Sequence, residues 1–319
     1  MKIRRALLVL GVTAIVYLAG LIWIDARNQV FAQLPRLLPI LPGLFALSLL
    51  SWLVRYLRWY WLLRRAGSRT RFAYGFLAYL SGFAFTATPG KVGELLRIRY
   101  LARERVPPWR VVSAFVFERA LDLVVVLTLS ALAISRMDVF IAALLFVLLF
   151  LLAILLLVFN PRWLAQMAAH LRACRFKRLS RLSLALRDGL RGCRTWATPV
   201  DVLLSLGLGM IAWSLTSLCF VFLLRALDVP IPLPSAMAIY PLAMLAGAAS
   251  MLPGGIGSTE VAIVALLSLF NLAPATATLA AVGIRIATMW FAVFCGFFAV
   301  GLLERQSGTT APVCRDYFR

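Results

Sequence analysis

Six ionisable residues lie inside or beside apolar stretches of this 319-residue sequence, where charged side chains are rare. They are Glu94, Glu118, Arg119, Asp122, Glu260 and Arg285. A charge near the centre of a bilayer costs at least about 2.5–3.5 kcal/mol, so such residues normally face a bundle interior and pair with one another. A set of this kind can hold a charged ligand or a coupling proton. The alternative is that its members are structural ion pairs between helices.

The spacing of these residues predicts how they point. Glu118 and Asp122 are four residues apart and therefore share one face of a helix. Arg119 follows Glu118 directly, so its side chain points about 100° away from that face. We therefore expect Arg119 to meet a different carboxylate, Glu94 or Glu260.

Two proline–glycine breaks interrupt apolar segments in corresponding halves of the chain. Residues 89–93 read Pro-Gly-Lys-Val-Gly, residues 253–257 read Pro-Gly-Gly-Ile-Gly, and a glutamate follows each break. Proline ends one half-helix and glycine permits the turn, so a new half-helix should begin near Val92 or Ser258. The helix-breaking residues are Pro89, Gly90, Gly93, Pro253, Gly254, Gly255 and Gly257.

A half-helix that begins inside the protein favours an anion such as phosphate at its free N–H groups. Lys91 and Arg97 add positive charge at the first break, and Ser258 or Thr259 could cap the second half-helix. The alternative is a glycine-rich packing contact between helices. The predicted substrate-binding residues are Lys91, Glu94, Arg97, Glu118, Arg119, Asp122, Glu260 and Arg285.

The composition predicts an all-α, polytopic membrane protein with one integral membrane domain, residues 1–319. Hydrophobic residues make up 63% of the chain and charged residues 14%, and the mean hydropathy is +0.93. Soluble domains have roughly 45–50% apolar and about 25% charged residues. Six full spans are predicted, at about 6–24, 43–63, 109–134, 139–159, 200–225 and 275–303. Arg55 and Arg58, near the end of the second span, are expected to snorkel to the interface.

The charge distribution predicts the orientation. The net charge is +21, and 25 of the 33 Lys and Arg residues lie at the termini and in segments 64–71, 91–110 and 162–194. By the positive-inside rule these parts, both termini included, are cytoplasmic. Residues 160–199 form a basic amphipathic segment expected on that surface.

The two broken segments, about 72–104 and 235–271, should then be re-entrant hairpins that enter from opposite sides. This places an inverted repeat in the half-repeats 43–134 and 200–303. Two thin full spans in place of each hairpin remain an alternative.

Several kinds of chemistry find no support in the sequence. His170 is the only histidine, and the five cysteines form no Cys-x-x-Cys pair, so neither a metal site nor a disulfide framework is predicted. No cofactor and no catalytic residue is predicted. The basic charge is better explained by membrane orientation than by nucleic-acid binding, because the sequence has no soluble recognition module.

The motifs resemble those of a known family. Residues 88–97 (Thr-Pro-Gly-Lys-Val-Gly-Glu-Leu-Leu-Arg), 117–122 (Phe-Glu-Arg-Ala-Leu-Asp) and 252–260 (Leu-Pro-Gly-Gly-Ile-Gly-Ser-Thr-Glu), with Arg285, are similar to the membrane region of lysylphosphatidylglycerol synthase/flippase proteins. The resemblance covers about residues 5–305. It implies a flippase-like fold that moves a lipid headgroup between the leaflets of a bacterial inner membrane. Family members often carry a cytosolic aminoacyl-transferase domain; this sequence contains none, and we expect a stand-alone member.

The leading hypothesis is therefore a transporter, not an enzyme, that moves an anionic phospholipid or a polyprenyl-phosphate-linked lipid. Lys91, Arg97 and the half-helix N–H groups would hold the phosphate. The carboxylates Glu94, Glu118, Asp122 and Glu260 would pair with Arg119 and Arg285, or would bind a cationic headgroup or a coupling proton. One alternative is a membrane-embedded enzyme or accessory subunit that acts on lipid-linked sugars or aminoacyl lipids, with paired carboxylates as general acid and base. Another is a structural partner in a synthase complex. A synthase and a second copy of the chain are the protein partners considered.

Overall fold

The computed structural model describes residues 34–131 apart from residue 87, residues 161–173 and residues 198–307. It also describes short stretches between residues 183 and 196 and the isolated residues 11, 141, 145, 148, 149 and 152. The described parts are helices and turns without strands. The predicted spans 6–24 and 139–159 lie outside the described residues except at isolated positions.

Three long helices form the frame of the molecule. They are α3 (Leu41–Arg65), α6 (Pro108–Ala131) and α10 (Pro199–Ala226). At 1.5 Å per residue each is long enough to cross a hydrocarbon core of about 30 Å. They match the predicted spans 43–63, 109–134 and 200–225 closely, because hydropathy detects long apolar helices well.

Helices α3 and α10 pack antiparallel against each other. Ser48, in the first half of α3, contacts Cys219 in the last part of α10, and Arg65 at the end of α3 pairs with Asp201 at the start of α10. The segments that follow these two helices therefore begin at opposite ends of the bundle.

The first hairpin follows α3. Its first arm consists of α4 (Phe72–Ser81) and η2 (Gly82–Phe85). Its returning arm consists of η3 (Pro89–Leu96) and α5 (Arg97–Leu101). A hydrogen bond from Arg71 Nε to Glu104 Oε1 at 3.0 Å brings the two arms to the same end of the bundle. The returning arm begins its helical turns at Pro89, three residues before the predicted Val92, and it begins as a 3₁₀ helix.

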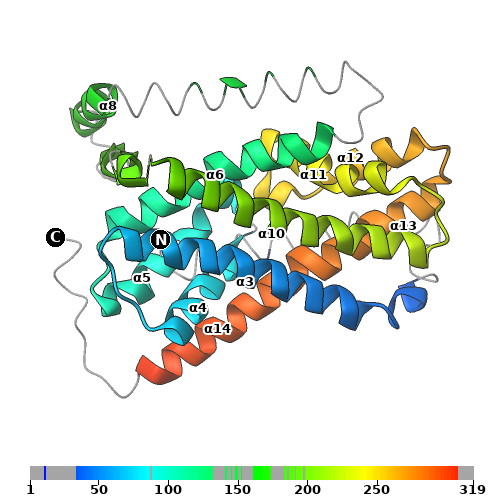
Figure 1. Cartoon of the computed structure of the whole chain (residues 1–319), viewed down its shortest axis with the longest axis horizontal. Coiled ribbons are helices and arrows are strands. Elements are labelled where there is room, and N and C mark those ends of the chain that lie inside the picture. The colour runs from blue at the N-terminus through cyan, green and yellow to red at the C-terminus, as the bar shows by residue number, and fades with distance from the viewer. Residues whose placement is uncertain are drawn as a thin grey trace.

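The second hairpin follows α10. It consists of α11 (Leu233–Ala249), η6 (Pro253–Gly255) and α12 (Ser258–Ser268). The second half-helix starts at Ser258, as predicted. Figure 1 shows α4 and α5 at one end of the long helices and α11 and α12 at the other, and the two tips meet where η3 contacts η6.

The last long helical segment passes both hairpins. It comprises α13 (Pro274–Arg285), η7 (Ile286–Trp290), which is a turn of π-helix, and α14 (Phe291–Ser307). Helix α13 packs against α12, and α14 packs against α4 and η2. The residues Pro274–Gln306 and Pro199–Ala226 are the two described segments that are both long and apolar enough to cross a membrane by length and composition. Helices α3 and α6 carry more charged side chains, of which Arg55, Arg58, Glu118 and Asp122 are buried.

Each hairpin has its own apolar core. One cluster joins α11, α12 and α13 to the last part of α10, and it includes Phe220 and Tyr240. The other joins α4 and α14 to the second half of α3, and it includes Trp59 and Tyr79. The polar tips of the hairpins meet between these two cores.

Part of the predicted cytoplasmic segment 160–199 is described. Helix α8 (Pro161–Ala173) is mostly exposed, with Ala168 buried. Trp196, at the other end of the segment, is fully buried, and its indole Nε1 donates to the Leu62 carbonyl at 2.8 Å. The end of this segment is therefore packed into the bundle against α3.

Candidate functional site

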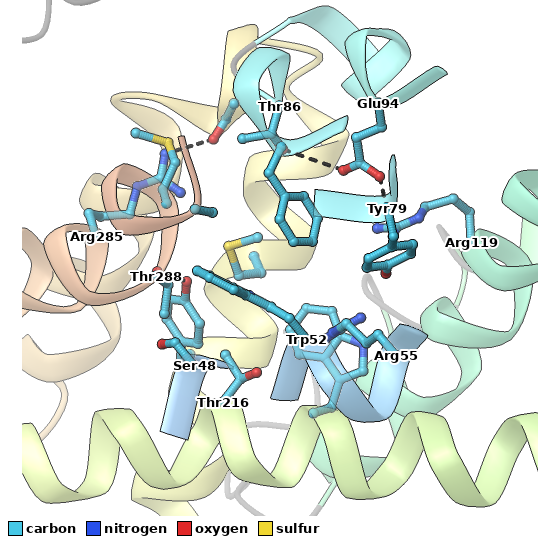
Figure 2. A pocket seen from close by; sticks show the side chains of 17 residues that line it. Ser48, Trp52, Arg55, Tyr79, Thr86, Glu94, Arg119, Thr216, Arg285 and Thr288 are labelled. Atoms are coloured by element: carbon cyan, nitrogen blue, oxygen red, sulfur yellow. Dashed lines mark hydrogen bonds and ion pairs between the residues drawn. The ribbon is translucent and has the colours of Figure 1, made fainter. Parts of the chain in front are cut away.

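A cavity of about 110 Å³ lies where the two hairpins meet the frame. The first hairpin contributes Thr86 and Glu94 to its wall, the second contributes Gly254, and α3 contributes Trp52 and Arg55. Figure 2 shows Arg285 on one side of the cavity and Arg119 with Glu94 on the opposite side. Both breaks therefore border one cavity, although they are 164 residues apart in the sequence.

The first break is shaped by a close backbone contact. The Gly93 N–H donates to Thr88 Oγ1 at 2.8 Å, and Thr88 Oγ1 donates to the Phe85 carbonyl at 2.9 Å. A Cβ atom at Gly93 would collide with the Phe85 carbonyl oxygen and with Thr88 Oγ1. Only glycine allows this approach, and it fixes the next residue, Glu94, at the cavity wall.

Glu94 is buried and strongly held. Its carboxylate accepts from Arg97 Nη2 at 2.9 Å and from Thr86 Oγ1 at 3.4 Å. Arg97 is fully buried, also donates from Nε to the Glu94 carbonyl at 2.9 Å, and lies over the Tyr79 ring at 4.5 Å. Arg97 does not line the cavity; it positions Glu94 from behind.

A buried ion cluster supports the same wall from α3 and α6. Arg58 Nη2 donates to Glu118 Oε1 at 2.7 Å and to Asp122 Oδ1 at 2.8 Å, and Arg55 Nη1 donates to Asp122 Oδ2 at 3.0 Å. The shared face predicted for Glu118 and Asp122 is thus occupied by Arg58. Neither carboxylate lines the cavity.

The expectation that Arg55 and Arg58 snorkel to the interface is wrong. The Arg58 side chain is 0% exposed, and Arg55 lies over the Trp213 ring at 4.7 Å. Both arginines face α6 and α10, so the carboxylates of α6 are closer to them than the end of α3 is. Arg55 lines the cavity, whereas Arg58 is behind it.

The Arg119 side chain is 24% exposed, and its ion-pair distances are longer than those of Arg55, Arg58 and Arg97. Its guanidinium nitrogens lie 3.8 Å from Glu94, 3.9 Å from Glu118 and 3.8 Å from Asp122, all beyond hydrogen-bonding distance. The Arg119 Nε has no hydrogen-bond partner among the described residues. The predicted neighbour Glu94 is confirmed, but Arg119 does not turn away from the α6 carboxylates. Because each of these carboxylates has a closer arginine, the Arg119 donors are available to a ligand.

The second break contains three glycines with positive φ. Gly254, Gly255 and Gly257 have φ values of 63°, 64° and 82°, a region that side chains with a Cβ disfavour. The expected caps, Ser258 and Thr259, do not cap α12. Instead the Glu260 carboxylate reaches back and accepts from the Gly257 N–H at 2.8 Å.

Arg285 ties the last long helical segment to the second break. Its Nε donates to Glu260 Oε1 at 2.9 Å, and its Nη2 donates to the Gly254 carbonyl at 2.6 Å. The side chain lies in the cavity wall, but the Glu260 partner does not line the cavity. The charge of Arg285 is therefore offset by a carboxylate behind the wall.

The N–H groups that these breaks offer are partly used inside the protein. The Gly93 N–H is taken by Thr88 and the Gly257 N–H by Glu260. The side chain of Lys91 lies outside the described part of the structure, as do those of the residues beside it from 89 to 92. Among the described groups, the arginines are the principal anion-binding donors of the cavity.

The described charges leave an excess of positive charge on one side of the cavity. The carboxylates of Glu94, Glu118 and Asp122 face the guanidinium groups of Arg55, Arg58, Arg97 and Arg119. Counted over the described side chains, three negative charges meet four positive ones. A buried excess charge is costly, so this side of the cavity favours an anion.

Sequence reasoning missed most of the cavity wall on the side opposite Glu94 and Arg119. Four hydroxyl residues line it there, from α3, α10, α11 and η7: Ser48, Thr216, Tyr240 and Thr288. The π-helical turn η7 was also missed; such turns are frequent at functional sites. A signal did exist on α3, because Ser48, Trp52 and Arg55 repeat at helical spacing on one face.

No group of three or more His, Cys, Asp or Glu side chains among the described residues is arranged to hold a metal ion. The wall instead combines guanidinium, hydroxyl and aromatic groups. Such a lining suits an organic ligand with an anionic and a polar part.

The fold and the site define a class, namely an integral membrane protein built of helices around an internal cavity that both polar and apolar side chains line. The chain belongs to the family described as Lysylphosphatidylglycerol synthase TM region, which matches residues 7–296. Comparison with curated proteins gives no match, and comparison with solved structures gives none either. Family membership confirms the resemblance seen in the motifs and gives the protein a function related to membrane lipids.

Proposed function

We propose that this protein is a flippase-like transporter that moves an anionic phospholipid or a lipid-linked phosphate from one leaflet to the other. The observation that carries the proposal is the cavity between the two hairpin tips, with Arg55 and Arg119 in its wall. Excess positive charge offers a place for a phosphate that would otherwise have no partner in the bilayer core. The acyl or prenyl chains would remain in the surrounding lipid.

The arrangement of the hairpins supports movement between two sides. The first hairpin starts at the end of α3 and the second at the opposite end of the bundle. We propose that they are re-entrant from opposite sides of the membrane, in half-repeats 43–134 and 200–303. Opening one hairpin at a time would expose the cavity alternately, as in other inverted-repeat transporters. In this proposal the basic segments and both termini face the cytoplasm of a bacterial cell.

A cavity-filling variant tests the proposal. Thr216 on α10 lines the cavity, so Thr216→Trp should fill it, whereas Ile211→Trp on the same helix adds the same ring at a half-exposed position outside it. Purified proteins would be reconstituted into liposomes with fluorescent phospholipid, and dithionite would measure transfer between leaflets.

We expect transfer by the wild type and by Ile211→Trp, and a loss of at least tenfold in Thr216→Trp. Equal transfer by all three proteins, with both variants folded, would overturn the proposal. Mass spectrometry of the lipids after the assay separates transport from chemistry: a converted lipid would support the membrane-embedded enzyme instead.

A further inference from the structure

The cavity has two chemically different ends. Figure 2 places Arg55, Arg119 and Glu94 toward one end, and Ser48, Thr216 and Thr288 toward the other. Trp52 lies between them. A ligand that fills the cavity therefore meets the guanidinium groups of Arg55 and Arg119 at one end, and hydroxyl groups beside Arg285 at the other.

The hydroxyl end presents acceptors. Ser48 Oγ donates to the Ala287 carbonyl at 2.8 Å, and Thr288 Oγ1 donates to the Ile284 carbonyl at 2.6 Å. Tyr240 OH lies 2.9 Å from Thr288 Oγ1. Since the Thr288 hydrogen goes to the backbone, Tyr240 must be the donor of this pair. The hydroxyl hydrogens are thus committed within the protein, and the remaining lone pairs can accept from ligand O–H groups.

A cationic ligand group does not suit the hydroxyl end. Arg285 lies beside this end, and its carboxylate partner Glu260 is behind the wall. Glu94, the one carboxylate among the described lining residues, is at the opposite end and is already bound by Arg97 at 2.9 Å. An ammonium group would therefore meet a nearby guanidinium without an uncommitted carboxylate.

The cationic end suits a phosphodiester. Its described excess is a single positive charge, carried by Arg119, which lies 3.8 Å from Glu94 while Arg97 lies 2.9 Å from it. One negative charge balances this end, and a phosphodiester carries one.

We infer that the cavity selects a lipid phosphodiester with an uncharged, hydroxyl-bearing headgroup, with the phosphate at Arg55 and Arg119 and the hydroxyls at Ser48, Tyr240 and Thr288. This inference rests on the proposed function for its lipid ligand. It predicts that a cationic aminoacyl lipid and a phosphomonoester bind more weakly than this ligand. A glycerol headgroup and a sugar on a polyprenyl phosphate share this chemistry.

Binding to the purified full chain in nanodiscs tests the inference separately from transport. The probes are phosphatidylglycerol, a polyprenyl phosphosugar, phosphatidic acid and lysyl-phosphatidylglycerol, each competing with a fluorescent phosphatidylglycerol. At least one of the first two should bind tenfold or more tightly than the last two, and which of them does so identifies the source of the headgroup. Stronger binding of the lysyl lipid or of phosphatidic acid would overturn the inference.

Variants locate the selectivity. Thr288→Val should reduce the preference for the hydroxyl-bearing lipid over phosphatidic acid about threefold to tenfold, the effect of one neutral hydrogen bond. Thr128→Val is the matched control, since Thr128 makes the same hydrogen bond to its own helix on an exposed face of α6. A preference unchanged by Thr288→Val and by Ser48→Ala would also overturn the inference.

The two proposals fail in different ways. Selective binding without transfer between leaflets would remove the transport function and leave the headgroup assignment standing. Transfer between leaflets with a preference for the lysyl lipid would support the transport function and overturn the headgroup assignment.

Discussion

Arg58 is the single cation on which the buried cluster depends most. Its side chain is fully buried and donates to both Glu118 and Asp122. The substitution Arg58→Met keeps much of the apolar length and removes the charge. Asp122 keeps Arg55 at 3.0 Å, but among the described residues Glu118 retains only Tyr79 at 3.3 Å and the more distant Arg119 at 3.9 Å.

The expected loss of stability arises because the buried Glu118 carboxylate no longer has a close cationic partner. Removing one partner of a buried ion pair typically costs about 3–5 kcal/mol. At roughly 2–4 °C per kcal/mol for a chain of this size class, the melting temperature should fall by about 6–20 °C. Heating the detergent-solubilised protein while following tryptophan fluorescence measures this directly.

Two further variants separate the charge from other effects. Arg64 lies on the same helix at an exposed position, so Arg64→Met should change the melting temperature little. In Arg58→Met/Glu118→Gln the uncompensated charge is gone, so more than half of the lost stability should return. A single variant within about 1 kcal/mol of the wild type, or a double variant less stable than the single one, would refute the assignment of Arg58 to a buried cluster.

Three smaller predictions concern local geometry. Gly93→Ala should destabilise the protein by about 1–3 kcal/mol in thermal melting, because the new Cβ collides with the hairpin backbone. In the control Gly43→Ala the new Cβ points into open space and should not destabilise the protein. Equal melting temperatures of the two variants would contradict this. Gly257→Ala should cost about 1–2 kcal/mol from its φ of 82° alone, and a neutral result, as expected for Gly301→Ala inside α14, would argue against that backbone. Burial raises the pKa of the Cys193 thiol to about 12, so the thiol stays protonated at pH 8 and N-ethylmaleimide should label it slowly until the protein is unfolded; rapid labelling of the folded protein, followed by mass spectrometry, would contradict the burial.

The sequence was sufficient to predict the long helices and the positions of the breaks. Apolar runs of 24 to 28 residues define α3, α6 and α10, and the Pro-Gly pairs mark where the hairpins turn. These features are local, because they depend on composition and backbone chemistry over one or two turns. The start of the returning arm at Pro89 differs from the expected residue because helix ends vary by a few positions.

Side-chain partners could not be predicted in the same way. Arg58 was assigned to the membrane surface because its position along α3 was known, but not the helix that its face would meet. Its neighbours Glu118 and Asp122 are 60 and 64 residues further along the chain. Helical spacing places Ser48 on one face of α3 with Trp52 and Arg55, but it does not show that this face meets Thr288, because the two residues come together only when α3 packs beside the π-helical turn.

The cavity itself depends on both hairpins. Thr86 and Gly254 become neighbours of one space because the first hairpin enters from one end of the bundle and the second from the other. The charge pattern along the chain predicted entry from opposite sides of the membrane. It did not predict that Arg97 would lie behind Glu94, so that Arg55 and Arg119 would provide the donors in the cavity wall.

The most direct test of the central claim is native mass spectrometry of gently extracted protein, which counts phosphate-bearing lipid retained per chain. The informative variant is Arg119→Gln, because Glu94, Glu118 and Asp122 each keep a closer arginine and the fold should survive. The exposed Arg64→Gln removes the same charge from the surface and serves as the control. We predict one phospholipid held by the wild type and by Arg64→Gln, and at least a tenfold weaker retention in Arg119→Gln; equal retention by all three proteins would contradict a phosphate site in the cavity.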